Sequence, residues 1–357
     1  MPPIPKGGTV AVTGAAGFVG GWVVRTLLDK GYRVRACVRD VNDTTKTAFL
    51  KAMPGYATGR LTLHSANLDN PGCFDDIFKG CHGVAHVSHI SNYGNQDYVR
   101  KVCDHIAESI NKSGTVSRLV FTSSIAAVVS ETNLSEMVNR PVIYEDRYPD
   151  PDSPKRTAYS ISKEQAERAF TEAAKESGRW DTIICCPGDN VGPIQSEHQK
   201  SGGPWQHLIE LMLQGKCNPA VHGYRPWHTV DVRDHAACQV GLLESVFVRN
   251  GERYLACSTD RIDIEDVCRS IDRLLPELGY ATPDLSEDLD EESLRKARER
   301  RAIYWGTDLR NDRIRALLNI TFRPLDDSLR DCIESLLTVG RVRPVLRPGY
   351  SFKGVTE

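Results

Sequence analysis

The stretch that decides the fold reads GTVAVTGAAGFVG and spans residues 8–20. Its first part, Gly8–Thr13, is a short apolar run of the kind that forms a buried strand. Apolar residues then recur at helical spacing over Val19–Lys30, and Gly31 suits the end of that helix. A strand, a glycine-rich turn and a helix in this order form the opening unit of a β-α-β fold.

The same alternation continues along the chain to residue 187. Further strands are expected at Tyr32–Val38, Leu61–Ser65, Gly83–Val87, Arg118–Ser123 and Thr182–Cys186, and helices at Cys73–Lys79, Val99–Asn111 and Ser160–Ser177. Strands that alternate with helices form a parallel sheet with both faces covered. The sequence therefore predicts the α/β fold class, with a Rossmann-type, doubly wound parallel sheet.

The alternation weakens after residue 187, which indicates a second unit interleaved with the first. The later elements that we still expect are a strand at Thr229–Val232, a helix at Asp234–Ser245 and a strand at Arg253–Cys257. We expect a dinucleotide-binding sheet domain formed by residues 1–187, to which residues 226–258 return. Residues 188–225 and 259–345 would then form a smaller α/β C-terminal lobe that binds the substrate.

Composition and charge exclude several classes of protein. A formal net charge of −2 over 357 residues gives no broad basic field for nucleic acid or an anionic membrane. The apolar runs are too short to span a bilayer, and the start, MPPIPKGGTV, has no apolar signal region. The 11 cysteines are scattered without zinc-ligand spacing, so we expect reduced thiols, no metal site and a cytoplasmic location.

The three glycines of the first turn have the spacing GxxGxxG. Gly14 permits a tight turn, Gly17 allows a pyrophosphate to approach the backbone at the helix N-terminus, and Gly20 allows close packing of helix on strand. A plain tight turn would use glycines too, but the position between a strand and a helix favours a dinucleotide site.

The end of the second strand indicates which dinucleotide is bound. A protein that binds NAD usually has an acidic residue there for the ribose 2′-hydroxyl. The chain instead has Val38 and then Arg39, with Lys46 shortly after, and both cations can bind a 2′-phosphate. The alternative is that Arg39 is solvated and Asp40 serves as the ribose acid. We expect NADP(H).

Tyr159 and Lys163 lie four residues apart, so their side chains share one face of a helix. A free tyrosine, with a pKa of about 10, is a poor proton donor and acceptor at neutral pH. We expect the Lys163 ammonium to lower the pKa of Tyr159, which can then give its proton to a carbonyl oxygen as hydride reaches the carbon. Lys163 can also hydrogen-bond the nicotinamide ribose.

A serine pair completes this candidate catalytic site. Ser123 and Ser124 follow the strand-like Arg118–Ser123 run, and ligands of open α/β sheets bind beyond the carboxyl ends of the strands. Either hydroxyl can hydrogen-bond a substrate carbonyl and stabilise developing oxyanion charge, although a turn or a helix cap is the alternative use. The three groups together predict an oxidoreductase that reduces an aldehyde or ketone.

Seven segments make the chain similar to the extended short-chain dehydrogenase/reductase family, in the branch of dihydroflavonol 4-reductase, cinnamoyl-CoA reductase and the fungal aldehyde (methylglyoxal) reductases. They are VTGAAGFVG (Val12–Gly20), GYRVRACVRD (Gly31–Asp40), GVAHVSH (Gly83–His89), RLVFTSS (Arg118–Ser124), YSISK (Tyr159–Lys163), CPGDNVGP (Cys186–Pro193) and VDVRDHA (Val230–Ala236). The resemblance covers nearly the whole chain.

The resemblance implies a role for each matching position. It implies that Ser124, rather than Ser123, acts with Tyr159 and Lys163 in catalysis. The positions that it implies for NADP(H) binding are Gly14, Gly17, Phe18, Val19, Arg39, Lys46, Asn67, Leu68, Val87, Ser88, Tyr159, Lys163 and Pro187. Asn67 stands where the family has an aspartate. Asp231 is expected to cap the following helix.

The chain departs from the family pattern in one helix and before the catalytic tyrosine. The stretch that usually carries Gly-Thr-x-Asn reads Val102-Cys103-Asp104-His105, so the asparagine of the proton relay is replaced by His105 or is absent. The cinnamoyl-CoA reductase signature NWYCY has no match before Tyr159, which argues against that substrate. Candidate substrate contacts are Ile90, Tyr93, Trp205, His207, Tyr224 and Trp227, although ordinary packing or a place at the pocket rim is the alternative for each and the more common one.

Three other functions use the same fold. Sugar-nucleotide epimerases and dehydratases and 3β-hydroxysteroid dehydrogenases share the three catalytic groups, but Arg39 argues against the NAD-holding epimerases. A non-catalytic NADP(H)-sensing regulator would typically lack the tyrosine and lysine. We expect a small-molecule carbonyl substrate and a monomer or homodimer.

Overall fold

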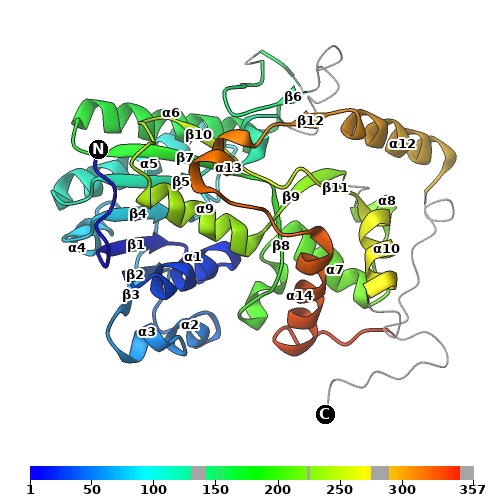
Figure 1. The fold of residues 1–357 in the computed structure, drawn as a ribbon, viewed down its shortest axis with the longest axis horizontal. Helices are drawn as coiled ribbons and strands as arrows, with labels where there is room; N and C mark the ends of the chain where they lie inside the picture. Colours follow the sequence, from blue (N-terminus) through cyan, green and yellow to red (C-terminus); the bar gives the residue numbers. More distant parts are fainter. Residues whose placement is uncertain (130–141, 151, 155, 223–225, 275–288, 346–357) are drawn as a thin grey trace.

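The computed structural model describes residues 1–129, 142–150, 152–154, 156–222, 226–274 and 289–345. A seven-stranded sheet of order β10-β7-β5-β4-β1-β2-β3 forms the centre of the larger part (Figure 1). All neighbouring strands in it are parallel. The strands are β1 (Thr9–Thr13), β2 (Arg33–Val38), β3 (Leu61–Ser65), β4 (Gly83–His86), β5 (Arg118–Thr122), β7 (Asp181–Pro187) and β10 (Arg253–Ala256). The predicted Rossmann-type sheet is confirmed.

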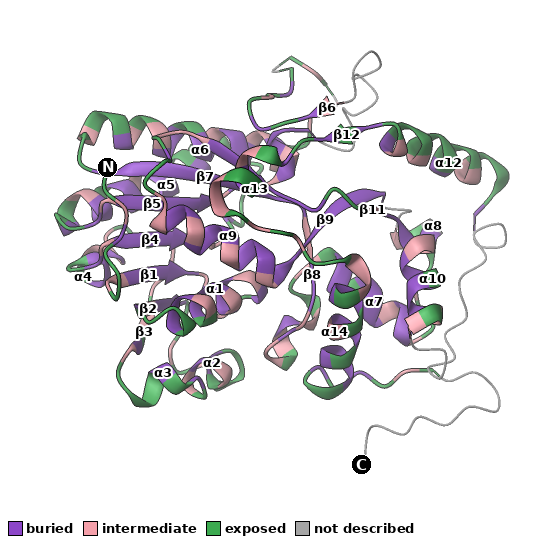
Figure 2. Ribbon diagram, viewed as in Figure 1, coloured by how far each residue is buried: buried purple, intermediate pink, exposed green. Residues whose placement is uncertain are grey.

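Helices cover both faces of this sheet. One face carries α1 (Phe18–Asp29) and α9 (Val232–Glu244), and the other carries α4 (Asp75–Phe78), α5 (Gln96–Ser113) and α6 (Ala158–Ser177). Side chains alternate along a strand, so Val10 and Val12 of β1 enter one core while Ala11 enters the other. Figure 2 shows the consequence: the central strands are buried, the edge strand β3 is only partly so, and α5 and α6 are exposed on their outer sides.

Local capping sets where the helices around the site begin and end. The Thr157 side chain accepts a hydrogen bond from the Ser160 backbone N–H, so α6 begins just before Tyr159. Helix α6 ends at Gly178, in the left-handed conformation with φ of 62°. Asp231 accepts from the Arg233 N–H and caps α9, as expected.

A smaller lobe lies on the right in Figure 1. It contains η3 (Glu197–Ser201), α7 (Pro204–Leu213), α8 (Pro219–His222), α10 (Ile264–Leu274), α14 (Leu325–Thr338) and a sheet of order β11 (Arg261–Ile262), β9 (Trp227–Asp231), β8 (Asp189–Val191). Of the range 226–258, α9 and β10 pack with the large sheet, whereas β9 pairs with β8 and β11. The lobe core includes Trp205 and Leu336 and also Phe18, the first residue of α1.

The remaining elements lie at the edges of the two parts. Helices α2 (Thr44–Lys51) and α3 (Pro54–Ala57) connect β2 to β3, and the sequence patterns did not predict them. The strand β12 (Asp308–Leu309) pairs with β6 (Val142–Ile143) between α12 (Glu291–Trp305) and α13 (Asp312–Leu318). Helix α12 projects from the lobe and is mostly exposed (Figure 2).

Candidate active site

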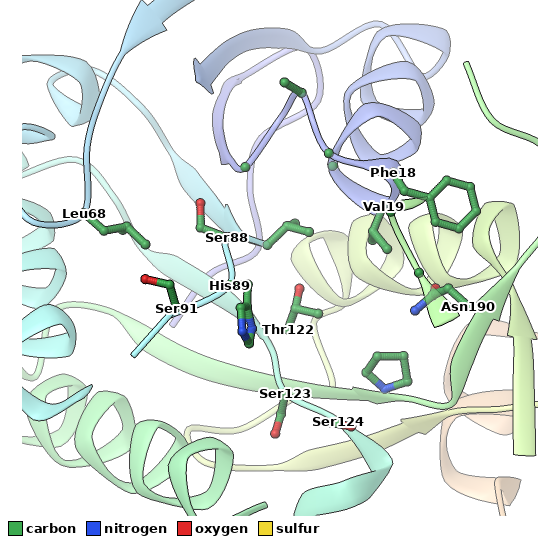
Figure 3. Close-up of a pocket in the computed structure, with 18 of the residues that line it drawn as sticks. Phe18, Val19, Leu68, Ser88, His89, Ser91, Thr122, Ser123, Ser124 and Asn190 are labelled. Carbon is green, nitrogen blue, oxygen red and sulfur yellow. The ribbon is translucent and has the colours of Figure 1, made fainter. Parts of the chain in front are cut away.

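A cavity of about 1010 Å³ opens beyond the carboxyl ends of the central strands (Figure 3). This is the place where open α/β sheets bind ligands, and the size suits a dinucleotide with a small substrate. All the positions predicted for catalysis and cofactor binding line it: Gly14, Gly17, Phe18, Val19, Arg39, Lys46, Asn67, Leu68, Val87, Ser88, Ser124, Tyr159, Lys163 and Pro187. The fold brings them together, and their individual roles stay predictions.

The glycine-rich loop has a shape that only glycine permits at two positions. Gly14 has a φ of +67°, and a Cβ on it would lie 3.0 Å from the Ser88 backbone. A Cβ on Gly20 would lie 2.1 Å from the Gly14 carbonyl oxygen. Helix α1 begins after Gly17 with no side-chain cap, so its first N–H groups are available to an anion.

The two cations near the end of β2, Arg39 and Lys46, differ in whether they form an ion pair. Arg39 is exposed and forms no ion pair with any residue that the structure describes. The Lys46 Nζ instead lies 3.3 Å from Asp43 Oδ2. The Asp40 Oδ1 accepts a hydrogen bond of 2.9 Å from the Asn42 N–H, so this carboxylate closes a turn. The geometry therefore offers a 2′-phosphate a free guanidinium at Arg39.

His86 fixes the two strands at the centre of the cavity floor. The Thr13 Oγ1 accepts from the N–H groups of Val87 (3.1 Å) and Ser88 (3.2 Å), so its own proton goes to His86 Nδ1 at 2.7 Å. Complete burial, with the Lys163 ammonium as a second cause, lowers the pKa of His86 to about 3. His86 is therefore neutral and holds β1 against β4.

Tyr159 and Lys163 lie in the first two turns of α6. The Lys163 Nζ donates to the Thr122 carbonyl oxygen at 2.9 Å and lies 5.7 Å from the centre of the Tyr159 ring. Burial lowers the pKa of Lys163 to about 8, although the nearby Glu167 carboxylate opposes this shift. Lys163 therefore keeps its proton at neutral pH but loses it within the alkaline range that enzymes are assayed in.

The pKa of Tyr159 shifts opposite to our expectation. Burial raises it, because the phenolate is poorly solvated there, and a hydrogen bond with the Ser124 hydroxyl opposes the rise only in part. Lys163 does not lower it in this structure, since the ammonium is directed to the Thr122 carbonyl. The expected phenolate stabilisation is thus absent, and Tyr159 holds its proton firmly at neutral pH.

The structure separates the two serines that the sequence left open. The buried Ser123 hydroxyl donates to Glu167, which is itself paired with Arg253 at 3.1 Å. The Ser124 hydroxyl lines the cavity, bonds Tyr159 and accepts from the Ala126 N–H at 3.1 Å. Ser124 is therefore the hydroxyl available to a carbonyl oxygen, and it also caps a short 3-10 helix (Ile125–Ala127).

His89 lies beside Tyr159, and sequence reasoning left it unassigned. The His89 ring centre is 5.9 Å from that of Tyr159 and 5.6 Å from that of Tyr93. Its side chain is exposed within the cavity (Figure 3), and neither ring nitrogen bonds a residue that the structure describes. Its position just after a central strand was the signal that could have identified it.

A buried polar chain supports Thr122, whose carbonyl oxygen accepts the hydrogen bond from Lys163. The Gln239 side chain donates to Thr122 Oγ1 at 2.8 Å and lies 3.1 Å from His235 Nε2. The His235 Nδ1 in turn lies 2.7 Å from Asn190 Oδ1. His105, by contrast, is not among the residues that line the cavity, so its predicted part in a relay receives no support.

Only some of the candidate substrate contacts lie at the cavity. Trp227 lines the cavity, and Tyr93 contacts the Tyr159 ring at 5.8 Å. Ile90 is buried in the core beneath α5, and Trp205 is completely buried in the lobe core, so neither prediction holds. His207 lies on α7 outside the lining, and Tyr224 lies outside the described residues.

Two features are absent from the part of the chain that the structure describes. No group of three or more His, Cys, Asp or Glu residues there is arranged to hold a metal ion. No helix there combines the length and apolar character needed to cross a membrane.

Comparisons with known proteins agree with this geometry. Residues 10–257 match the NAD dependent epimerase/dehydratase family. The chain is 35% identical to a dihydroflavonol 4-reductase of Callistephus chinensis over 297 residues, which cover 80% of this chain and 77% of the relative. Vestitone reductase from alfalfa (Medicago sativa L.) superposes with a TM-score of 0.71 at 26% identity, over 92% of this chain and 98% of its own.

A second solved structure shares the fold at lower identity. Yeast methylglyoxal/isovaleraldehyde reductase, solved in complex with NADPH, superposes with a TM-score of 0.71 at 21% identity, over 94% of this chain and 100% of its own. The family match spans most of the chain, and it includes the glycine-rich loop, the serine pair and the Tyr159–Lys163 pair. The chain therefore belongs to the NAD dependent epimerase/dehydratase family, the extended short-chain dehydrogenases/reductases.

Proposed function

We propose that this protein is an NADPH-dependent carbonyl reductase, which reduces an aldehyde or ketone to an alcohol. The observation that carries the proposal is that the half-buried Tyr159 and Ser124 line one cavity, in which the unpaired Arg39 lies at the far end. The relatives support it, since all three are named as reductases, and the yeast methylglyoxal/isovaleraldehyde reductase was solved with NADPH.

Bound NADPH would supply the hydride. The chain's residues then have the following parts. The Ser124 hydroxyl donates a hydrogen bond to the substrate carbonyl oxygen and holds it near the Tyr159 phenol. As negative charge grows on that oxygen, Tyr159 transfers its proton to it, which completes the alcohol. The Lys163 ammonium would hydrogen-bond the nicotinamide ribose and so help to place the cofactor beside the carbonyl group.

The cofactor would lie along the line of predicted contacts. The first N–H groups of α1 would meet the pyrophosphate, Arg39 the 2′-phosphate, and Asn67 and Leu68 the adenine. Residues of the lobe, with His89 and Tyr93 from the loop after β4, would enclose the substrate. The lobe is thus proposed as the substrate-binding part of the molecule.

The experiment follows NADPH absorbance with a panel of aromatic and aliphatic aldehydes, α-dicarbonyls, a dihydroflavonol and a ketosteroid. We expect turnover that prefers NADPH, and a fall in kcat of about 10²–10⁴-fold in Tyr159→Phe, since a positioned general acid contributes that much. Tyr56→Phe, which changes an exposed phenol outside the cavity, serves as the matched control and should keep kcat within about threefold. Unchanged kcat in Tyr159→Phe would show that the proton comes from elsewhere.

A further inference from the structure

A segment of the lobe packs against the glycine-rich loop, and His198 and Gly202 of this segment line the same cavity as the loop. The Trp22 Nε1 of helix α1 donates to the Pro193 carbonyl oxygen at 2.7 Å. The Phe18 ring is buried in the lobe core, and Figure 3 shows it on the same side of the cavity as Asn190. A Cβ on Gly202 would lie 2.9 Å from the Phe18 Cβ, so segment and loop are in close contact.

Two side chains of this segment bind carbonyl groups of the loop. The His198 Nε2 donates to the Ala16 carbonyl oxygen at 2.8 Å. The Gln199 Nε2 donates to the same oxygen at 3.2 Å and to the Gly17 carbonyl oxygen at 3.3 Å. Both nitrogens come from the lobe, so the loop is held by a part of the chain far from it in sequence.

Both side chains are themselves held in place. The Ser196 hydroxyl bonds the other ring nitrogen of His198 at 2.9 Å, which leaves the Nε2 proton for Ala16. The Gln199 Oε1 accepts from the Gln195 N–H at 2.9 Å, and the Gln199 side chain is 1% exposed. An ordered donor of this kind loses little further conformational entropy when it fixes a loop.

Because the peptide bond is planar, a hydrogen bond that fixes a carbonyl group also fixes the direction of the N–H that follows it. In a trans peptide the C=O and the following N–H point in opposite directions. The hydrogen bond from Gln199 to the Gly17 carbonyl therefore directs the Phe18 N–H away from Gln199. Holding the Ala16 carbonyl does the same for the Gly17 N–H, which closes the turn onto Gly14 at 2.9 Å.

We propose that His198 and Gln199 are positioning residues for the cofactor pyrophosphate. They act through the Ala16 and Gly17 carbonyls and keep the loop in the shape that presents its N–H groups to an anion. The lobe thus contributes to the cofactor-binding site as well as to the proposed substrate-binding site. The proposal rests on the proposed function for the identity of the ligand.

The test compares two ligands by isothermal titration calorimetry. NADPH uses the whole site, whereas adenosine 2′-monophosphate has no pyrophosphate and reaches only the Arg39 end. In the His198→Ala/Gln199→Ala double variant we expect the Kd of NADPH to rise about tenfold or more, since the three neutral hydrogen bonds to the loop are lost. We expect the Kd of adenosine 2′-monophosphate to stay within about twofold and kcat at saturating NADPH to be nearly unchanged.

Two further variants make the result specific. His207→Ala removes an exposed histidine of the same lobe outside the cavity and should change neither Kd. His198→Gln keeps a side-chain N–H donor and should recover part of the NADPH affinity. Equal weakening of both ligands in the double variant would indicate general distortion and overturn the proposal, as would an unchanged NADPH Kd. A wild-type protein that binds neither ligand would instead overturn the proposed function itself.

Discussion

Replacing Arg39 tests whether its charge makes the protein prefer NADPH to NADH. Arg39→Gln removes the charge but keeps a hydrogen-bonding side chain. Because Arg39 forms no ion pair with a described residue, no internal partner weakens its contact with a phosphate. A hydrogen bond to a charged group contributes about 2 kcal/mol, so the loss corresponds to about thirtyfold in kcat/KM for NADPH.

The neighbouring cation gives an internal comparison. Lys46 already lies 3.3 Å from Asp43 Oδ2 and must share its charge with that carboxylate. Its side chain is 53% exposed, so solvent screens its interaction further. Lys46→Gln should therefore lower kcat/KM for NADPH by less than about fivefold.

The assay measures kcat/KM with NADPH and with NADH on one substrate. We expect the NADPH value to fall in Arg39→Gln while the NADH value stays the same, since NADH has no 2′-phosphate. Asp40→Asn is the matched control, because Asp40 is the alternative ribose contact. Equal losses with both cofactors in Arg39→Gln, or a selective loss of NADH activity in Asp40→Asn, would refute the reasoning.

Three further predictions concern the catalytic pair, the loop and the substrate side. Burial lowers the pKa of Lys163 to about 8, and the protonated form is the active one. The kcat/KM for reduction should therefore be constant below that pH and fall above it. A kcat/KM that stays constant to about pH 10 would contradict this prediction. Gly20→Ala should lower the free energy of unfolding by about 1–3 kcal/mol and weaken NADPH binding in urea and calorimetric titrations, whereas Gly94→Ala, with open space around it, should change neither. His89→Phe keeps a ring beside Tyr159 but removes the unpaired nitrogens, so the substrate KM should rise about fivefold with the NADPH Kd unchanged; an unchanged KM would assign His89 to packing alone.

The elements around the cofactor loop could be predicted closely because their signals are local. The strand expected at Leu61–Ser65 has those bounds, and β1 and α1 differ from expectation by a residue each. Continuous apolar runs, glycines and caps depend on few neighbours in sequence. The same holds for the serine, tyrosine and lysine positions, since each follows from its place on a strand end or in a helical turn.

The lobe was harder to predict, although one signal in it was overlooked. Trp205 was a candidate substrate contact. However, the apolar residues Trp205, Leu208, Ile209, Met212 and Leu213 repeat at helical spacing and form the buried face of α7. Pro204 at the first position of that helix agrees with this pattern. The helical spacing of these apolar residues, rather than the tryptophan by itself, indicates that this segment packs in a core.

Other features could not be read from sequence because they depend on what surrounds a group in space. The pKa of Tyr159 depends on its burial and on where the Lys163 ammonium points, and neither follows from their four-residue spacing. The contacts of His198 and Gln199 with the glycine-rich loop join segments that no local pattern relates. Only the packing of the lobe against α1 shows them.

The return of α9 and β10 to the large sheet affects how this protein is made. Helix α9 packs on α1 and covers the face of the sheet that contains Val10 and Val12. A nascent chain that has emerged only to residue 187 covers this face with α1 alone and lacks the edge strand β10. The sheet can reach its final form only after the ribosome has synthesised residue 256, so half-made chains expose an apolar surface that chaperones recognise.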